Sequence, residues 1–240
     1  MNPCHVLVTR PDGQQQALVD RLERDGFQVS HQPALVIEPL ALSVESQDCL
    51  AHLDRYHVVV LISRNAADIA LSLLRTHWSR WPAGVHWLAV GDATAQVLQA
   101  AGLQAERPEQ GFNSEALLAM PLLQDLAGRR VLLLRGEGGR EVLAPAIRAR
   151  AEALDEIALY RRACNAGFTW PSAPVQAVMA TSQQGWECIA PQVPRDCCVI
   201  AGSARIAALI AAEGYPVRTA ASPHDEDMCA ALHAWCAEKR

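Results

Sequence analysis

The chain has 240 residues, of which half are hydrophobic, and its formal net charge is −5 at pH 7. This length leaves room for one large domain or for two small ones with packed cores. The acidic balance excludes a general nucleic-acid binder, because such proteins need a basic surface.

The spacing of cysteine and histidine matches none of the common metal motifs. The eight cysteines include no C-x-x-C pair, and the eight histidines form no H-E-x-x-H pattern, so we expect no metal. Most cysteines stand in apolar surroundings, which predicts small buried thiols of a reducing cytosol. A catalytic thiol is the alternative.

The start of the chain has no apolar leader segment, and the longest apolar runs, 58–62 and 206–212, are too short to cross a bilayer. We therefore expect a soluble, cytoplasmic protein that does not enter the membrane.

The chain opens with a strand at 6–8, a helix and a second strand. Asp12 is placed to cap the helix, and Gly26 is placed to close it in the left-handed conformation. This order puts Thr9 and Arg10 at the carboxyl end of the first strand, where open α/β sheets bind ligands. An ordinary capped loop is the alternative for this pair.

Two buried strands at 58–62 and 87–90 are each followed by a helix, and a shorter helix follows a loop that ends at 113. Small residues stand at or near the starts of these helices. They are Ser63, Gly91, Thr94 and Ser114, and Ser114 with Glu115 is expected to cap the shorter helix.

A glycine-rich turn after the apolar strand 131–134 is the most informative stretch of the chain. Arg135 and Arg140 flank this turn, which contains Gly136 and two more glycines, and we expect a helix from Glu141 onward. Free N–H groups at a helix start, together with two arginines, predict an anion-binding turn. The dinucleotide fingerprint does not fit, since Glu141 takes the place of its third glycine. A plain turn with solvated arginines is the alternative.

The segment 153–162, which follows the glycine-rich turn and its helix, is predicted to form a strand. In this strand Ile157 and Leu159 share one face, and Ala158 and Tyr160 share the other.

Strands at 175–179 and 199–201 complete the pattern, and small or polar residues follow each of them. These residues are Thr181, Ser182, Gly202, Ser203 and Arg205. Residues 58–102 and 175–214 share one order of strand, small polar residue, helix, strand, glycine and helix. This similarity predicts a duplicated α/β unit.

The second of these blocks lacks an opening strand–helix pair, which residues 1–33 would supply. We therefore predict a discontinuous first domain, 1–33 with 166–240, and a second domain, 41–160, inserted into it. Residues 34–40 and 155–165 would be the interdomain links, which can pair with each other as a two-stranded hinge. The predicted fold class is α/β, with two open parallel sheets.

The strand ends of both domains are expected to face a shared cleft. Helix N-termini and small hydroxyls there would suit a ligand with many carboxylates or phosphates. Each serine or threonine alone is more often a simple N-cap, so this prediction depends on their number and their common placement.

An ordered set of short motifs resembles the uroporphyrinogen-III synthase family. The motifs are VLVTRP at 6–11, ISRNA at 62–66, AVGDAT at 89–94, NSE at 113–115, LRGEGGR at 134–140, LYRR at 159–162, ATS at 180–182 and GSARIA at 202–207. The resemblance covers essentially the whole chain. It implies two flavodoxin-like domains joined by a two-stranded link, with the first domain interrupted by the second.

The resemblance also implies a reaction without a cofactor. The linear tetrapyrrole hydroxymethylbilane loses its hydroxyl, its last pyrrole ring is inverted, and the macrocycle closes to uroporphyrinogen III. Tyr160 matches the family's tyrosine on the returning link, which is proposed to assist departure of the hydroxyl; a hinge aromatic is the alternative. Ile62 and Arg205 stand where many members have threonine, so they depart from the family pattern.

Two other classes of protein stay open. One is a hinged binding protein for an anionic small molecule, without catalysis. The other is a nucleotide-dependent oxidoreductase, which the broken glycine pattern disfavours. The expected partners are hydroxymethylbilane and, in a transient contact, the enzyme that makes it, with no nucleic acid and no membrane. We expect a monomer.

Overall fold

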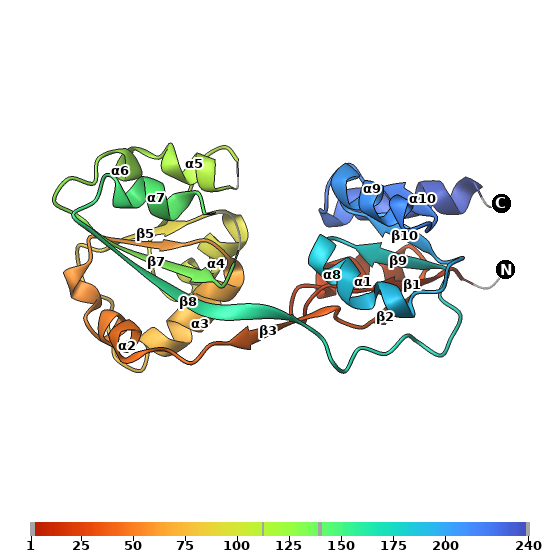
Figure 1. Ribbon diagram of the computed structural model, residues 1–240, viewed down its shortest axis with the longest axis horizontal. Coiled ribbons are helices and arrows are strands. Elements are labelled where there is room, and N and C mark those ends of the chain that lie inside the picture. The colour runs from red at the N-terminus through yellow and green to blue at the C-terminus, as the bar shows by residue number, and fades with distance from the viewer. Residues whose placement is uncertain (1–2, 112, 139–140, 239–240) are drawn as a thin grey trace. The chain divides into compact units, whose positions relative to one another are not determined.

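The chain forms two compact units, each built on one sheet (Figure 1). The computed structural model describes residues 3–111, 113–138 and 141–238. Unit 1 consists of Met1–Val36 and Ala163–Arg240, and unit 2 of Ile37–Arg162. Both boundaries between the units fall inside the stretches 34–40 and 155–165. Among the described residues, no helix has the length and apolar character that a membrane span requires.

The sheet of unit 1 has five parallel strands in the order β11-β10-β9-β1-β2. The strands are β1 (His5–Val8), β2 (Gln28–His31), β9 (Ala177–Ala180), β10 (Cys198–Ala201) and β11 (Val217–Thr219). The helices are α1 (Gln16–Arg24), α8 (Gln183–Ile189), the 3-10 turn η2 (Ala190–Gln192), α9 (Ala204–Ala212) and α10 (Asp225–Glu238). Helices α8 and α9 pack on one face of the sheet, and α1 and α10 pack on the other. Such a doubly covered parallel sheet explains the continuous apolar strands.

The sheet of unit 2 has six strands in the order β3-β8-β7-β4-β5-β6. The strands are β3 (Leu35–Pro39), β4 (Val58–Leu61), β5 (His86–Ala89), β6 (Ala105–Glu106), β7 (Arg130–Gly136) and β8 (Ala153–Cys164). The helices are α2 (Val44–Ala51), the 3-10 turn η1 (Leu53–Arg55), α3 (Arg64–Leu74), α4 (Asp92–Ala100), α5 (Ser114–Leu118), α6 (Pro121–Gln124) and α7 (Leu143–Arg148). Helices α2, α3 and α4 cover one face, and α5, α6 and α7 cover the other (Figure 1).

The two sheets share one strand arrangement. In unit 1 the order β2-β1-β9-β10-β11 is the flavodoxin-like order 2-1-3-4-5. In unit 2 the order β8-β7-β4-β5-β6 is the same, except that the matching first pair, β7 and β8, comes last along the chain. The predicted duplication is therefore present, and unit 2 is a circular permutation of the topology of unit 1.

The two segments predicted to link the domains pair with each other. Strands β3 and β8 are neighbours at the edge of the six-stranded sheet. The Leu40 N–H donates to the Leu159 carbonyl at 2.9 Å, and the Asn165 N–H donates to the Ala34 carbonyl at 3.0 Å. This crossed register makes the two strands antiparallel.

Three local predictions about helix starts are wrong. Asp12 does not cap α1: residues 11–14 form a turn, closed by the Gln14 N–H on the Pro11 carbonyl, and α1 then begins after Gln15 without a side-chain cap. Helix α7 begins at Leu143 and not at 141. Helix α5 is capped by Asn113, which accepts the Ala116 N–H, so Ser114 is already the first helical residue. By contrast, Gly26 follows α1 with a φ of +87°, as predicted.

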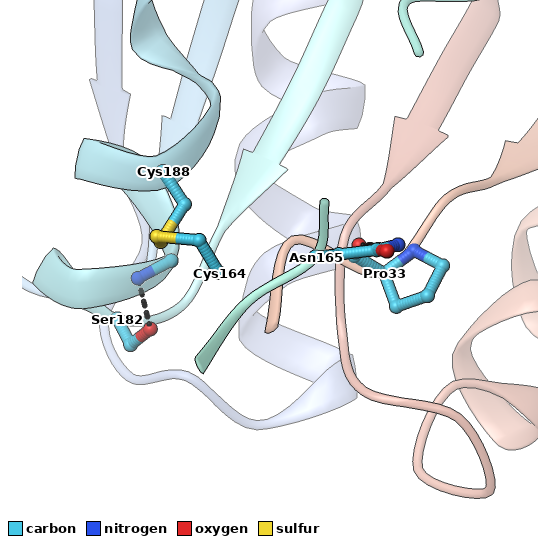
Figure 2. Close-up of a disulfide and its surroundings, with 6 residues drawn as sticks. Pro33, Cys164, Asn165, Ser182 and Cys188 are labelled. Atoms are coloured by element: carbon cyan, nitrogen blue, oxygen red, sulfur yellow. Dashed lines mark hydrogen bonds between the residues drawn. A yellow bond between two sulfur atoms is a disulfide. The ribbon is translucent and has the colours of Figure 1, made fainter. Parts of the chain in front are cut away.

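The expectation of buried thiols alone is also wrong, because Cys164 and Cys188 form a disulfide (Figure 2). The bridge ties the end of β8 to α8, with the two Cα atoms 5.4 Å apart. The other six cysteines keep their thiols, and all eight lie in the described part of the chain. Sequence spacing did not reveal this bridge, since only the tertiary fold brings its two Cβ atoms together.

Candidate active site

In unit 1, the predicted site residues Arg10 and Thr181 lie where the neighbouring strands β1 and β9 end. This is the point at which the strand order reverses, the usual ligand position in open α/β sheets. A cavity of about 370 Å³ lies there. It is lined by Arg10, Pro11, Gln14, Thr181, Pro223, His224 and Asp225. The structure therefore brings Arg10 and Thr181 to one site, as the sequence predicts.

Arg10 is the cation of this cavity, and it already has acceptors within the chain. Its guanidinium donates to a carboxylate oxygen of Asp225 and, at 2.7 Å, to the Pro223 carbonyl. Only 16% of its side chain is exposed. An anionic ligand would therefore share Arg10 with Asp225 or displace that carboxylate.

Thr9 has a structural role in the described chain. Its hydroxyl is buried and donates to the Met179 carbonyl at 2.7 Å, so it fastens β1 to β9. Gly202, at the end of β10, lies against Pro223; a Cβ at Gly202 would stand 3.1 Å from the Pro223 Cβ. The lack of a side chain therefore lets the loop that carries Pro223 close one wall of the cavity.

The serines after the strands are N-caps, which is the plainer of their two predicted roles. Ser63, Ser182 and Ser203 accept the N–H three residues further on, at 3.0, 3.0 and 3.4 Å. Each cap leaves the hydroxyl proton for a further acceptor.

The remaining predicted residues on helices are placed as follows. Gly91 is the N-cap position of α4, and Thr94 is buried one turn later. Arg205 on α9 donates to the Gln183 side chain of α8 at 2.7 Å. Arg205 therefore joins two helices of unit 1.

In unit 2 the predicted anion-binding arginine is engaged by the chain's own carboxylates. Arg135 donates to Glu141 at 2.7 Å and to Glu156 at 3.4 Å, and it also reaches the Gly136 and Gly138 carbonyls. The hydrogen bond from Arg135 lowers the pKa of Glu141. This geometry favours a role for Arg135 in holding the glycine turn against β8, and its contact with a ligand stays a prediction. Arg140 lies outside the described residues.

Tyr160 on β8 lies against the carboxyl ends of β7 and β4. Its hydroxyl is 2.9 Å from the Ser63 Oγ, and its ring packs on Gly136, where a Cβ would lie 2.5 Å from the tyrosine Cζ. The predicted alternation along this strand is wrong, because Ala158 is exposed while Tyr160 is buried with Leu159. The reason is a register shift between β7 and β8, which inserts one residue before Tyr160 and turns its side chain inward.

The comparisons with known proteins give one consistent result. The family model for "Uroporphyrinogen-III synthase HemD" matches residues 16–230. The uroporphyrinogen-III synthase of Escherichia coli K12 is 31% identical, over 92% of this chain and 96% of its own. The chain belongs to the uroporphyrinogen-III synthase family. Its members are hydro-lyases, and this chain is an enzyme of that class.

Other relatives agree with this membership. The uroporphyrinogen-III synthase of Proteus mirabilis is 35% identical, over 65% of this chain and 79% of its own. The solved uroporphyrinogen-III synthetase of Helicobacter pylori has a TM-score of 0.65 at 13% identity, and the match covers 97% of this chain and 99% of that one. At this low identity, the structural likeness supports the fold alone.

Of the seven residues that line the unit 1 cavity, sequence reasoning assigned only Arg10 and Thr181 to a site. Asp225, Pro223 and His224 come from the loop after β11, and Gln14 comes from the turn before α1. The one available signal was the run of proline, serine and acidic residues at 222–227, which is typical of a loop before a capped helix. Among the described residues, no group of histidine, cysteine or carboxylate side chains is arranged to hold a metal.

Proposed function

We propose that this chain converts hydroxymethylbilane into uroporphyrinogen III, with inversion of the last pyrrole ring and loss of one water. The observation that carries the proposal is the family match, which spans both units and not a single motif. The cavity at the strand-order reversal of unit 1 supports it, since it has the position that a ligand site of this fold should have.

We propose that the substrate's acetate and propionate carboxylates are held by local donors and not by the overall charge. The chain is acidic, with a net charge of −5, so it offers no general attraction for a polyanion. Arg10 and Thr181 line the unit 1 cavity. The Arg10–Asp225 pair suits exchange, because an incoming carboxylate can take the place of Asp225 on the same guanidinium.

The chemical step needs orientation more than strong acid. Departure of the hydroxyl leaves a cation that the pyrrole nitrogen stabilises, and the ring closure then releases the proton of the attacked pyrrole carbon. The difficulty is regiochemical, because the substrate also closes without inversion. We propose that the enzyme acts by holding the reacting carbons in the less accessible arrangement, and that Tyr160 assists the departing hydroxyl.

A direct test is incubation with freshly made hydroxymethylbilane, followed by oxidation and chromatographic separation of the porphyrin isomers. We expect isomer III from the wild-type chain, formed faster than the uncatalysed closure. Isomer I alone, at the uncatalysed rate, would show that the proposal is wrong.

Arg21, which forms an ion pair with Glu226 on the surface, provides a matched control for the role of Arg10 in substrate binding. Arg10→Gln should raise KM severalfold, because it removes the cation of the cavity. Arg21→Gln should leave KM unchanged, since Arg21 pairs with Glu226 on the exposed face of α1 and does not line the cavity. Equal KM values in the two variants would remove Arg10 from the binding site.

The proposed function also has consequences for where the protein is located and what it contacts. We propose a cytoplasmic monomer that receives hydroxymethylbilane through a transient contact with the enzyme that makes it. Size-exclusion chromatography coupled to light scattering tests the monomer, and a mixture of the two enzymes in the same experiment tests the contact.

A further inference from the structure

Tyr160 and Ser63 differ in how far solvent reaches them. Tyr160 is 2% exposed and packs in the core of unit 2. Ser63 is only partly buried and follows β4, at the carboxyl end of the sheet. The Ser63 Oγ lies 2.9 Å from the Tyr160 hydroxyl. A ligand at this end of the sheet therefore meets the serine hydroxyl, with the tyrosine hydroxyl behind it.

The hydrogen bonds of Ser63 leave its proton available. A serine hydroxyl can donate once and accept twice. One acceptor position takes the Ala66 N–H at 3.0 Å. If Tyr160 donates to the other, the Ser63 proton points to neither partner and is free for a ligand oxygen.

Tyr160 cannot easily swing out to meet a ligand itself. The Gly136 backbone lies against the ring so closely that a Cβ there would approach the Cζ to 2.5 Å. The backbone carbonyl of Tyr160 accepts the Glu137 N–H at 2.7 Å. The ring is therefore held between the end of β7 and the start of α3.

We propose that Ser63 is the catalytic residue that donates to the departing hydroxyl of the substrate, and that Tyr160 supplies the proton through Ser63. This inference rests on the proposed function and refines it. Serine alone is a weak acid, whereas a phenol is the stronger acid of the two. The pair thus joins an accessible donor to a buried proton source.

The proton count closes over one turnover. As the substrate's C–O bond breaks, the Ser63 proton moves to the leaving oxygen, which departs as water. The Tyr160 proton moves to Ser63 at the same time, so Tyr160 becomes a phenolate. When the ring closes, the attacked pyrrole carbon loses its proton, which returns to Tyr160 by the same two oxygens. Negative charge that develops on the pair is favoured by the N-terminus of the 11-residue helix α3, which Ser63 caps.

Substitutions of Ser63 can separate the chemical role of its hydroxyl from its role as the N-cap of α3. Ser63→Gly keeps most of the cap, because glycine is a tolerated N-cap residue, but it removes the donor. We expect kcat for isomer III to fall by about tenfold to a hundredfold in Ser63→Gly and in Tyr160→Phe, which is the scale of lost acid assistance, with little change in KM. The double variant should be no slower than the slower single variant, since both belong to one relay. Ser63→Thr should recover most of kcat.

Ser43→Ala is the matched control for a lost serine cap. Ser43 caps α2 by accepting the Ser46 N–H at 3.2 Å. Within the part of the chain that the structure describes, its hydroxyl is bonded to no tyrosine, so kcat should not change. Wild-type kcat in Ser63→Gly, combined with a loss in Tyr160→Phe, would overturn the relay and leave Tyr160 as the direct donor. Multiplicative losses in the double variant would overturn it as well. Isomer I alone from the wild-type chain is a different result, because it removes the proposed function itself.

Discussion

At the scale of single residues, Gly136 has a packing role that no polar group reveals. The Tyr160 ring occupies the space where a side chain at 136 would begin. We expect Gly136→Ala to lower the free energy of unfolding by about 2 kcal/mol, the usual cost of an overpacked core position. It should also lower kcat, because the ring can no longer reach Ser63. Urea unfolding and steady-state kinetics measure the two effects.

A second substitution tests whether this cost comes from the Tyr160 ring. In a Tyr160→Ala background the space is vacant, so Gly136→Ala should cost much less stability than it does in the wild type. An equal cost in both backgrounds would mean that the backbone at 136, and not the tyrosine, excludes a side chain.

Arg135 supports a prediction about pH. Its hydrogen bond lowers the pKa of Glu141 below the usual value of 4.5. A carboxyl whose pKa is lower in the folded state stabilises the fold above its unfolded pKa, and this contribution disappears as the pH falls through the folded pKa. The wild-type Tm should therefore fall more steeply below pH 4.5 than the Tm of Arg135→Ala. Parallel Tm curves for the two proteins would mean that solvent screens the pair completely.

The site residues that sequence reasoning placed well are those whose role is local. A serine between a buried strand and a helix is a predictable cap, and Ser63, Ser182 and Ser203 have that role. Arg10 was placed at the correct strand end, but its partner Asp225 is 215 residues away in sequence. Tyr160 was assigned to the wrong face, because a one-residue register shift between strands leaves no trace in the pattern of a single strand.

At the scale of elements, the disulfide constrains the segment that leads from β8 into unit 1. Cys164 and Cys188 are 24 residues apart, and closing a loop of that size lowers the entropy of the unfolded chain, which raises its free energy by about 3 kcal/mol at room temperature. Cys164 is exposed at the strand end, so a dithiol reductant can reach it. We expect reduction to lower the free energy of unfolding by about that amount, measured in urea with and without dithiothreitol.

The thiol count provides the control for this prediction. Denatured protein should show six reactive thiols before reduction and eight after it. Cys164→Ser with Cys188→Ser should have a stability that does not respond to dithiothreitol. Eight thiols without reduction, or equal stability under both conditions, would contradict the bridge.

Elements were predicted well wherever the signal lay within one segment. The apolar runs of β4, β7, β9 and β10 are buried on both faces and read directly as central strands. The start of α1 was misplaced because the turn at residues 11–14 competes with an Asp12 cap. The strand predicted over 153–162 is also present, and β8 continues to Cys164 beside β3.

At the scale of the whole molecule, the permuted topology explains why the two units look so different in sequence. In unit 1 the central strand β1 opens the chain, whereas in unit 2 the equivalent strand β7 comes after β4, β5 and β6. The carboxyl ends of β1 and β7 are therefore equivalent in the fold, and an arginine lies at each, Arg10 just after β1 and Arg135 within the last residues of β7. Each arginine is held by a carboxylate of its own unit. A comparison of the sequence with itself therefore finds only the repeat of 58–102 in 175–214, where the permutation leaves the order of elements unchanged.

The overall charge predicts how salt should affect substrate capture. An acidic chain repels a polycarboxylate at long range, and this repulsion is screened as the Debye length falls from about 30 Å at 0.01 M salt to about 8 Å at 0.15 M. Contacts made by half-buried donors such as Arg10 are screened much less. We therefore expect KM for hydroxymethylbilane to fall, or to stay constant, when sodium chloride rises from about 0.01 to about 0.15 M.

The rate of uncatalysed closure, measured in the same buffers, controls for any effect of salt on the substrate itself. A KM that rises severalfold over this range would contradict the prediction, because it would mean that a field of surface cations guides the substrate. Arg10→Gln gives a second check on the same quantity. If local donors dominate, this variant should have a higher KM than the wild type at every salt concentration, with the same direction of salt dependence.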